Sequence, residues 1–274
     1  MKTIFQTKKF LISILTLAIV VVCIYFVLQS TTSHARDVAN QENPIQLASE
    51  QPKVELSKPA PNQFNGQVRK VAYLTFDDGP GKYTAELLNI LKQYDAKATF
   101  FLTGKNVKAY PDLVKREKSE GHYVGMHSMT HDFKKLYTNG DYVNEMKTNQ
   151  SLIADIIDEK PQLTRPPYGS IPGLNEALRN KVFESGLKVW DWTIDSLDWK
   201  YNNLPLETAS VNIAQNVIIG ATRPKEVILL HDIHPQAVAA VPAIIKGLKE
   251  KGYEFEAYQE NDHFSLNFWH DPRI

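Results

Sequence analysis

Two histidines four residues apart offer the clearest chemistry in this 274-residue sequence. His127 and His131 follow directly after a short apolar run, residues 123–126. Their imidazoles would share one face, suited to a single metal ion, if the loop between them formed one helical turn. A pair of solvated loop histidines has the same spacing, so on this pattern alone the metal site is a hypothesis.

Two adjacent carboxylates follow another apolar run, in the segment Thr-Phe-Asp-Asp-Gly-Pro at residues 75–80. Asp77 and Asp78 would repel each other unless a cation or a proton lay between them. Because Asp, Gly and Pro all form turns, an ordinary turn is the competing explanation. With the two histidines, Asp78 would complete a His-His-carboxylate set. That set matches the ligands of a catalytic zinc ion and also suits other divalent metals.

Three further segments carry residues suited to catalysis or sugar binding. Arg165 begins the sequence Arg-Pro-Pro-Tyr-Gly, in which the prolines fix the backbone, so that Arg165 and Tyr168 would project in a set geometry. A surface turn is the alternative there. Residues 190–199 hold three Trp and three Asp, a combination that can hold sugar rings, although buried Trp usually belongs to the core. An apolar run at residues 227–230 ends at His231.

All these segments except the one that begins at Arg165 lie at the ends of predicted β-strands. After Lys70, short β-rich runs alternate with helical patterns, which indicates βα units around a mostly parallel sheet. The predicted strands are residues 71–75, 98–103, 123–126, 187–192, 227–230 and 253–257, and the predicted helices are residues 85–94, 111–120, 141–158, 206–219 and 238–251. Since active residues of parallel α/β sheets lie beyond the carboxyl ends of the strands, we expect the polar segments to meet.

The number of βα units bounds the architecture. About seven units in roughly 190 residues are too short for a regular eightfold barrel, which takes about 250 residues. We therefore predict an α/β fold, a distorted or incomplete (β/α) barrel of seven to eight units. A transmembrane helix and a flexible linker are expected to precede it.

Together the five segments resemble the motifs of the NodB-homology polysaccharide deacetylases, carbohydrate esterase family 4. The matching stretches are TFDDGP at 75–80, HSMTH at 127–131, RPPY at 165–168, DSLDW at 195–199 and LLH at 229–231. They occur in the family's order, and no motif position departs from it. The combination with an apolar N-terminal segment resembles the bacterial peptidoglycan N-acetylglucosamine deacetylases.

The resemblance implies a metal centre beside a general base. Asp78, His127 and His131 would hold a divalent metal, with zinc expected. The metal would activate water and polarise the substrate carbonyl. Asp77 would take the proton of the attacking water, and Arg165 would pair with Asp77 and keep it ionised.

The resemblance also implies a general acid and contacts to the substrate. His231 would protonate the departing amine, and Asp198 would orient His231 and stabilise its charged form. Trp199 would wall the acetyl pocket, with Leu229 also contacting the substrate. The backbone N–H of Tyr168 would help to bind the oxyanion.

The implied reaction is removal of N-acetyl groups from N-acetylglucosamine residues of cell-wall peptidoglycan. The same motifs also fit deacetylation of chitooligosaccharide, another exopolysaccharide or acetylxylan. A non-catalytic glycan-binding module is a third interpretation. It predicts loss of Asp77 or His231, and both residues are present.

Composition excludes some other classes of protein. Lys+Arg and Asp+Glu both number 31, whereas a nucleic-acid binder normally carries a basic surplus. No segment indicates a protein partner. The single cysteine, Cys23, cannot form an intramolecular disulfide. It also lies in the apolar N-terminal segment, so a metal in a soluble site must be held by His and carboxylate.

The N-terminal segment indicates export. Residues 10–28 are apolar and uncharged, and 19 residues of helix would span about 28 Å, close to one bilayer thickness. The lysines within residues 1–9 would keep that end in the cytoplasm. The length favours a single-pass anchor in a bacterial membrane with the catalytic domain outside. Small residues near Ala35 leave open a cleaved signal peptide and a secreted protein.

The remaining boundaries follow from changes in composition. Residues 29–70 are polar and proline-containing, which is typical of an extracytoplasmic linker. The deacetylase domain is expected at residues 71–260 and a C-terminal tail at 261–274. The tail's aromatic residues are expected to pack in the core rather than to extend the glycan cleft.

Overall fold

A computed structural model describes residues 63–274 apart from residue 65. The predicted membrane-spanning segment and most of the predicted linker lie outside the described residues. Within the described part, no helix is both long and apolar enough to cross a bilayer. A short antiparallel hairpin, β1 (Gln63–Phe64) and β2 (Gln67–Val68), occupies the end of the range predicted as linker.

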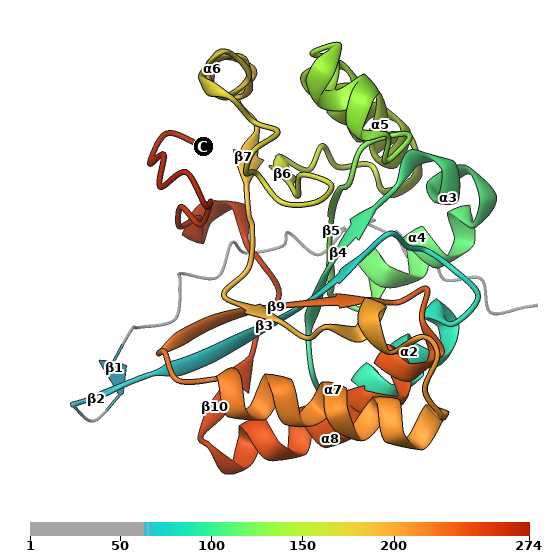
Figure 1. Ribbon diagram of the computed structural model, residues 1–274, viewed down its shortest axis with the longest axis vertical. Coiled ribbons are helices and arrows are strands. Elements are labelled where there is room, and N and C mark those ends of the chain that lie inside the picture. Colours follow the sequence, from blue (N-terminus) through green and yellow to red (C-terminus); the bar gives the residue numbers. More distant parts are fainter. Residues whose placement is uncertain (1–62, 65) are drawn as a thin grey trace, which may run out of the picture. The chain divides into compact units, whose positions relative to one another are not determined.

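A parallel sheet of eight strands forms the centre of the described domain (Figure 1). In spatial order its strands are β7 (Lys188–Val189), β6 (Leu163–Thr164), β5 (Tyr123–Met126), β4 (Ala98–Leu102), β3 (Lys70–Asp77), β9 (Lys225–His231) and β8 (Ile194–Asp195). The eighth strand, β10 (Tyr253–Phe255), pairs with the amino-terminal part of β3. The predicted βα organisation around a parallel sheet is confirmed.

The strand order requires the sheet to curl. β7 and β8 lie at opposite edges, yet only residues 190–193 join them along the chain. So short a segment spans at most about 17 Å, so the two edges must approach each other. Because no ladder joins β7 to β8 in the described sheet, the barrel stays open at this seam. The predicted incomplete barrel is therefore confirmed.

Helices cover the outer face of the sheet, with α7 and α8 side by side below it in Figure 1. They are α2 (Thr84–Gln93), α3 (Gly104–Ala109), α4 (Pro111–Ser119), α5 (Tyr142–Ile157), α6 (Glu176–Glu184), α7 (Leu206–Gly220) and α8 (Pro235–Glu250). Single helical turns occur at η1 (Lys134–Thr138), η2 (Asp198–Tyr201) and η3 (Glu260–Asp262). The five predicted helices are present with their ends shifted by a few residues, whereas α3 and α6 were not predicted.

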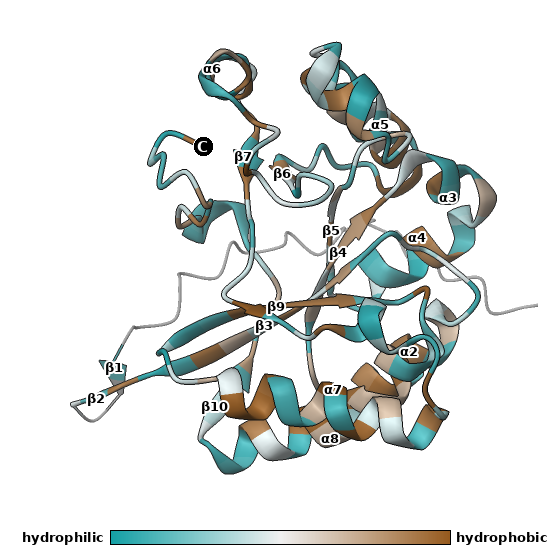
Figure 2. Ribbon diagram, in the orientation of Figure 1, coloured by the Kyte–Doolittle hydropathy of each residue, from teal (hydrophilic) through white to brown (hydrophobic). Residues whose placement is uncertain are grey.

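Successive side chains of β3 point alternately to the two faces of the sheet. Leu74 and Phe76 pack with the helices, while Val71 and Tyr73 join a smaller cluster inside the barrel. Since side chains alternate with a period of two, Asp77 continues the inner face at the carboxyl end of the strand. Figure 2 shows that the central strands are largely hydrophobic.

The C-terminal tail packs on the domain. Phe264 and Leu266 lie against the inner cluster, and Leu266 forms an isolated parallel bridge with Trp190. Ile274 is fully buried. Of the aromatic residues expected to pack in the core, Phe264 does so, whereas Trp269 remains 38% exposed.

Candidate active site

The predicted site residues lie at or shortly beyond the carboxyl ends of strands. Asp77 ends β3, and its register partner His231 ends the neighbouring strand β9. β5 ends directly before His127, and β6 ends directly before Arg165. Because the strands are parallel, these ends meet at one edge of the sheet, as expected.

A cavity of about 450 Å³ opens at this edge. All the predicted site residues line it except Arg165 and Asp198, which lie behind it. The lining comprises Asp77, Asp78, His127, His131, Pro166, Tyr168, Trp192, Asp195, Trp199, Leu229 and His231. No individual role was predicted for Pro166, Trp192 or Asp195, although all three belong to segments already singled out.

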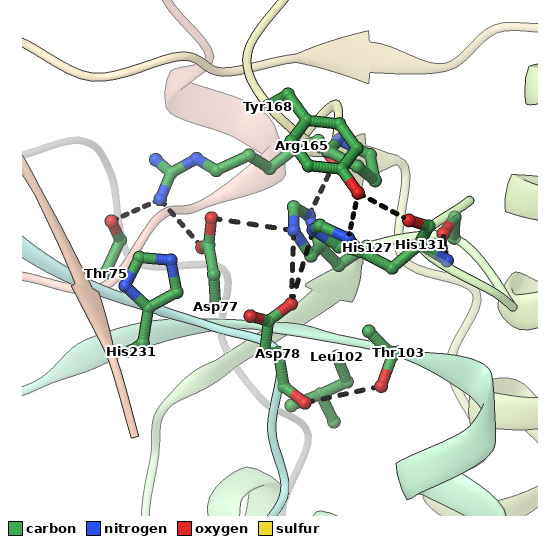
Figure 3. Close-up of polar contacts among 12 residues, drawn as sticks. Thr75, Asp77, Asp78, Leu102, Thr103, His127, His131, Arg165, Tyr168 and His231 are labelled. Atoms are coloured by element: carbon green, nitrogen blue, oxygen red, sulfur yellow. Dashed lines mark hydrogen bonds and ion pairs between the residues drawn. The ribbon is translucent and has the colours of Figure 1, made fainter. Parts of the chain in front are cut away.

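Asp78, His127 and His131 converge within the cavity (Figure 3). Oδ1 of Asp78 lies 3.6 Å from Nε2 of each histidine. Ligand atoms around a tetrahedral zinc ion, bonded at about 2.0–2.2 Å, lie roughly 3.3–3.6 Å apart. The three donors therefore fit one cation, and the predicted convergence is confirmed.

Both imidazoles are held in the tautomer that a metal requires. Nδ1 of His127 donates to the carbonyl of Arg165 over 2.8 Å, which leaves Nε2 with its lone pair. Burial lowers the pKa of His127 to about 3, so the ring is neutral. The hydroxyl of Tyr168 donates to the carbonyl of His131 over 3.0 Å and so accepts from Nδ1 of His131 at 3.2 Å. Both Nε2 atoms are thereby free to bind a metal.

The loop that carries the histidines does not form the helical turn that the spacing suggested. Ser128 and His131 have φ angles of 66° and 56°, in the left-handed region. The buried carboxylate of Glu145 on α5 accepts hydrogen bonds from the N–H groups of Met129 and Thr130, both at 3.1 Å. The hydrogen bonds from Glu145 therefore hold the loop in the conformation that brings the imidazoles together. The spacing of the histidines could not reveal this contact, because Glu145 lies on a separate helix.

We expect Tyr168→Phe to weaken zinc binding about tenfold, because loss of a partner that orients a ligand typically has an effect of this size. The substitution leaves Nδ1 of His131 without its acceptor. Competition against a chromophoric chelator measures the affinity. Tyr137→Phe is the matched control, since the Tyr137 hydroxyl bonds Pro167 of the same loop over 2.7 Å and touches no ligand. Equal zinc affinity in both variants would contradict this role of Tyr168.

Asp77 is buried against a buried arginine. Nη1 of Arg165 lies 3.0 Å from Oδ1 of Asp77, and the guanidinium also bonds Thr75 and two backbone carbonyls. Burial raises the pKa of Asp77 above its ordinary value, although Arg165 acts in the opposite direction. The predicted pairing of Arg165 with Asp77 is therefore present, and the charge of Arg165 favours the ionised carboxylate against the effect of burial. A carboxylate with a raised pKa is a stronger base.

His231, at the end of the strand next to β3, forms a second pair with Asp198. Nδ1 of His231 donates to Oδ1 of the buried Asp198 over 2.8 Å, and the backbone N–H of His231 donates to Oδ2 over 2.7 Å. Burial alone lowers the pKa of His231, but the hydrogen bond and charge of Asp198, together with the charges of Asp77 and Asp78, outweigh it and raise the pKa to about 9. His231 is therefore protonated at pH 7 and can donate from Nε2.

Asp198→Asn should move the alkaline limb of the kcat–pH profile downward. A general acid works only while protonated, so activity should fall as the pH rises through the pKa of His231, about 9 in the wild type. Without the negative charge of Asp198, that limb should shift toward the ordinary histidine value of about 6.5. Asp195→Asn, a nearby carboxylate with no bond to His231, should leave the limb in place. An unshifted limb in Asp198→Asn would remove His231 as its source.

The three tryptophans of residues 190–199 have separate environments. Trp190 is fully buried in the inner cluster and belongs to the core. Trp192 and Trp199 line the cavity, and Trp199 is 50% exposed. Only these two can contact a sugar ring.

The sequence was compared with known families and proteins. The sequence profile described as polysaccharide deacetylase matches residues 65–190. A peptidoglycan-N-acetylglucosamine deacetylase of Bacillus cereus is 70% identical over 269 residues, 98% of each chain. The chain belongs to the polysaccharide deacetylase family. The resemblance drawn from the motifs is confirmed, and the protein is a hydrolase.

Solved structures of other polysaccharide deacetylases share the fold. The crystal structure of a Bacillus cereus polysaccharide deacetylase is 76% identical, with a TM-score of 0.75 over 75% of this chain and 100% of that one. The catalytic domain of a peptidoglycan N-acetylglucosamine deacetylase from Eubacterium rectale is 34% identical. Its TM-score is 0.66, over 72% of this chain and 92% of that one.

The site of this polysaccharide deacetylase combines the parts that amide hydrolysis needs. It holds a set of metal donors, a buried carboxylate beside them and a protonated imidazole at the same strand edge. Asp77 and His231 are neighbours in register on β3 and β9, so they lie side by side in the cavity.

Proposed function

We propose that this chain is a zinc-dependent hydrolase that removes N-acetyl groups from the N-acetylglucosamine residues of peptidoglycan. The observation that carries the proposal is the convergence of Asp78, His127 and His131 in one cavity with Asp77 and His231. The Bacillus cereus relative of that name, 70% identical, supports the substrate. Two imidazoles and one carboxylate favour zinc among divalent metals.

The protein side chains supply the proton transfers of this reaction. Asp77 takes a proton from water as the water oxygen bonds to the acetyl carbon. His231 gives its Nε2 proton to the glycan nitrogen as the C–N bond breaks, which releases acetate and a free amine. When bound, the divalent cation would polarise the carbonyl and lower the pKa of water.

The backbone N–H of Tyr168 is the proposed donor to the oxyanion. Among the described residues this N–H has no hydrogen-bond acceptor, so it is available to a substrate. Trp199 and Leu229, which both line the cavity, are the proposed walls of the acetyl pocket. Leu229 is almost fully buried and supplies an apolar floor.

We also propose that the chain is exported and held at the bacterial membrane by residues 10–28. The uncharged apolar run and the lysines before it support this location. Cell fractionation tests it: the full-length chain should occur in the membrane fraction. A shortened chain in the medium that begins near Ala35 would instead indicate cleavage and secretion.

Acetate release by the purified full chain tests the proposed function. Peptidoglycan should give the highest rate, compared with chitooligosaccharide and acetylxylan. Chelation should abolish the release, and added zinc should restore it. Activity only on one of the other two polymers would overturn the substrate assignment, and no acetate from any of them would overturn the deacetylase activity.

A further inference from the structure

Asp191 lies at the open seam of the barrel, in the segment that joins β7 to β8, and is fully buried. Its carboxylate accepts from the N–H of Ser170 over 2.8 Å and from the Ser170 hydroxyl over 2.5 Å. It also accepts from the N–H of Phe268 over 2.7 Å. One buried carboxylate therefore joins the loop after β6 to the C-terminal tail.

The tail makes further contacts with the same loop. The indole N–H of Trp269 donates to the carbonyl of Ser170 over 3.0 Å. The rings of Phe268 and Trp192 meet edge to face with 5.0 Å between their centroids. A Cβ atom on Gly169 would lie 3.1 Å from the Phe268 ring and 3.2 Å from that of Trp192, so the loop fits closely against both.

The loop needs such support because its backbone is unusual. Tyr168 and Gly169 have φ angles of 67° and 83°, two successive left-handed residues. For a residue other than glycine this conformation is unfavourable, and it persists where the surroundings determine it. Within the loop itself, the Gly169 N–H bonds the carbonyl of Pro166 over 2.9 Å. The contacts from Asp191 and the tail lie immediately after this turn.

We propose that Asp191 is a positioning residue, which together with Phe268 and Trp269 clamps the turn that presents the backbone N–H of Tyr168 to the cavity. The C-terminal tail is thereby part of the active-site framework. Asp191 does not line the cavity, and it acts through the turn at Tyr168. This inference rests on the proposed deacetylase function, in which that N–H meets the oxyanion.

Asp191→Asn tests the clamp, because it keeps the shape and replaces one acceptor oxygen with a donor that faces the N–H of Phe268. Outright loss of an oxyanion donor costs about 100- to 1,000-fold in kcat. A displaced donor should cost less, so we expect about a 10- to 100-fold loss in kcat for acetate release, with KM and zinc affinity near wild type. Hydrogen–deuterium exchange of the peptide that contains residues 168–170 should become faster.

Asp271→Asn is the matched control, since Asp271 pairs with Arg179 and Arg273 in the same tail and makes no bond to the turn. It should keep wild-type kcat and wild-type exchange at residues 168–170. Ser170→Ala is the milder second variant should Asp191→Asn fail to fold, since it removes the hydroxyl's bond to Asp191 and the longer one from the N–H of Phe268 but keeps the backbone bond to Asp191. Like Asp191→Asn, Ser170→Ala should lower kcat and leave the zinc affinity unchanged.

Wild-type kcat and exchange in a folded Asp191→Asn or Ser170→Ala variant would overturn the clamp. Equal losses of kcat in Asp191→Asn and Asp271→Asn would also overturn it, because they would indicate general destabilisation of the tail. A wild-type protein that releases no acetate would refute the proposed function instead, and the exchange measurement still tests the clamp in that case.

Discussion

Asp77→Asn should lower kcat for acetate release by about 100- to 10,000-fold, the usual contribution of a general base. Asn keeps the shape of Asp and can still accept from Arg165, but it cannot take a proton from water. Zinc binding should be unchanged, because the donors that converge are Asp78 and the two histidines. Acetate assays on peptidoglycan, with zinc content measured on the same samples, check both statements.

Asp112→Asn is a suitable control, since Asp112 is a 95% exposed carboxylate on α4, outside the cavity. It should retain wild-type kcat. If Asp77→Asn retained a wild-type rate with zinc bound, Asp77 would have no part in proton transfer. If it instead lost its zinc, Asp77 would belong to the metal site.

His231→Ala should lower kcat for the amide substrate to a similar degree, about 100- to 10,000-fold, because a departing amine needs a proton. The loss should be much smaller for an aryl acetate ester such as 4-nitrophenyl acetate, whose leaving group departs as an anion. Asp77→Asn should lose activity toward both substrates, because each requires an activated water. The ratio of amide to ester rates therefore separates the acid from the base.

His234→Ala is the neighbouring control. Its ring centroid lies 5.8 Å from that of His231, and the carboxylate of Asp198 bonds His231 instead. The His234→Ala variant should hydrolyse both the amide and the ester substrate at rates near wild type. An amide rate in His231→Ala that fell no further than the ester rate would assign the acid to another group.

The long strands and their polar ends could be predicted because hydrophobicity changes sharply there. The predicted runs at residues 71–75 and 227–230 lie within β3 and β9, and the next polar residues are Asp77 and His231. β6 and β8 have two residues each, too few for any periodic pattern. The predicted strand at residues 187–192 covers β7 and the first part of the segment that joins β7 to β8.

The contacts that orient the site residues could not be predicted, because they join segments that are far apart in the sequence. The hydroxyl of Tyr168 reaches His131 only through the left-handed turns at both residues. The anchor at Glu145 lies on α5, beyond the motif that it supports. The raised pKa of Asp77 depends on complete burial, which the sequence does not state. Residue types and order indicated the chemistry, whereas tertiary packing determined the protonation states.

Anomalous diffraction at the zinc edge, from crystals of this protein grown with zinc, tests the central claim most directly. The claim is that three side chains from two strand-end loops hold one cation. We expect one strong peak at about 2.0–2.2 Å from Nε2 of His127, Nε2 of His131 and a carboxylate oxygen of Asp78. A peak bound elsewhere, or one bound by the two histidines with Asp78 out of reach, would contradict the account.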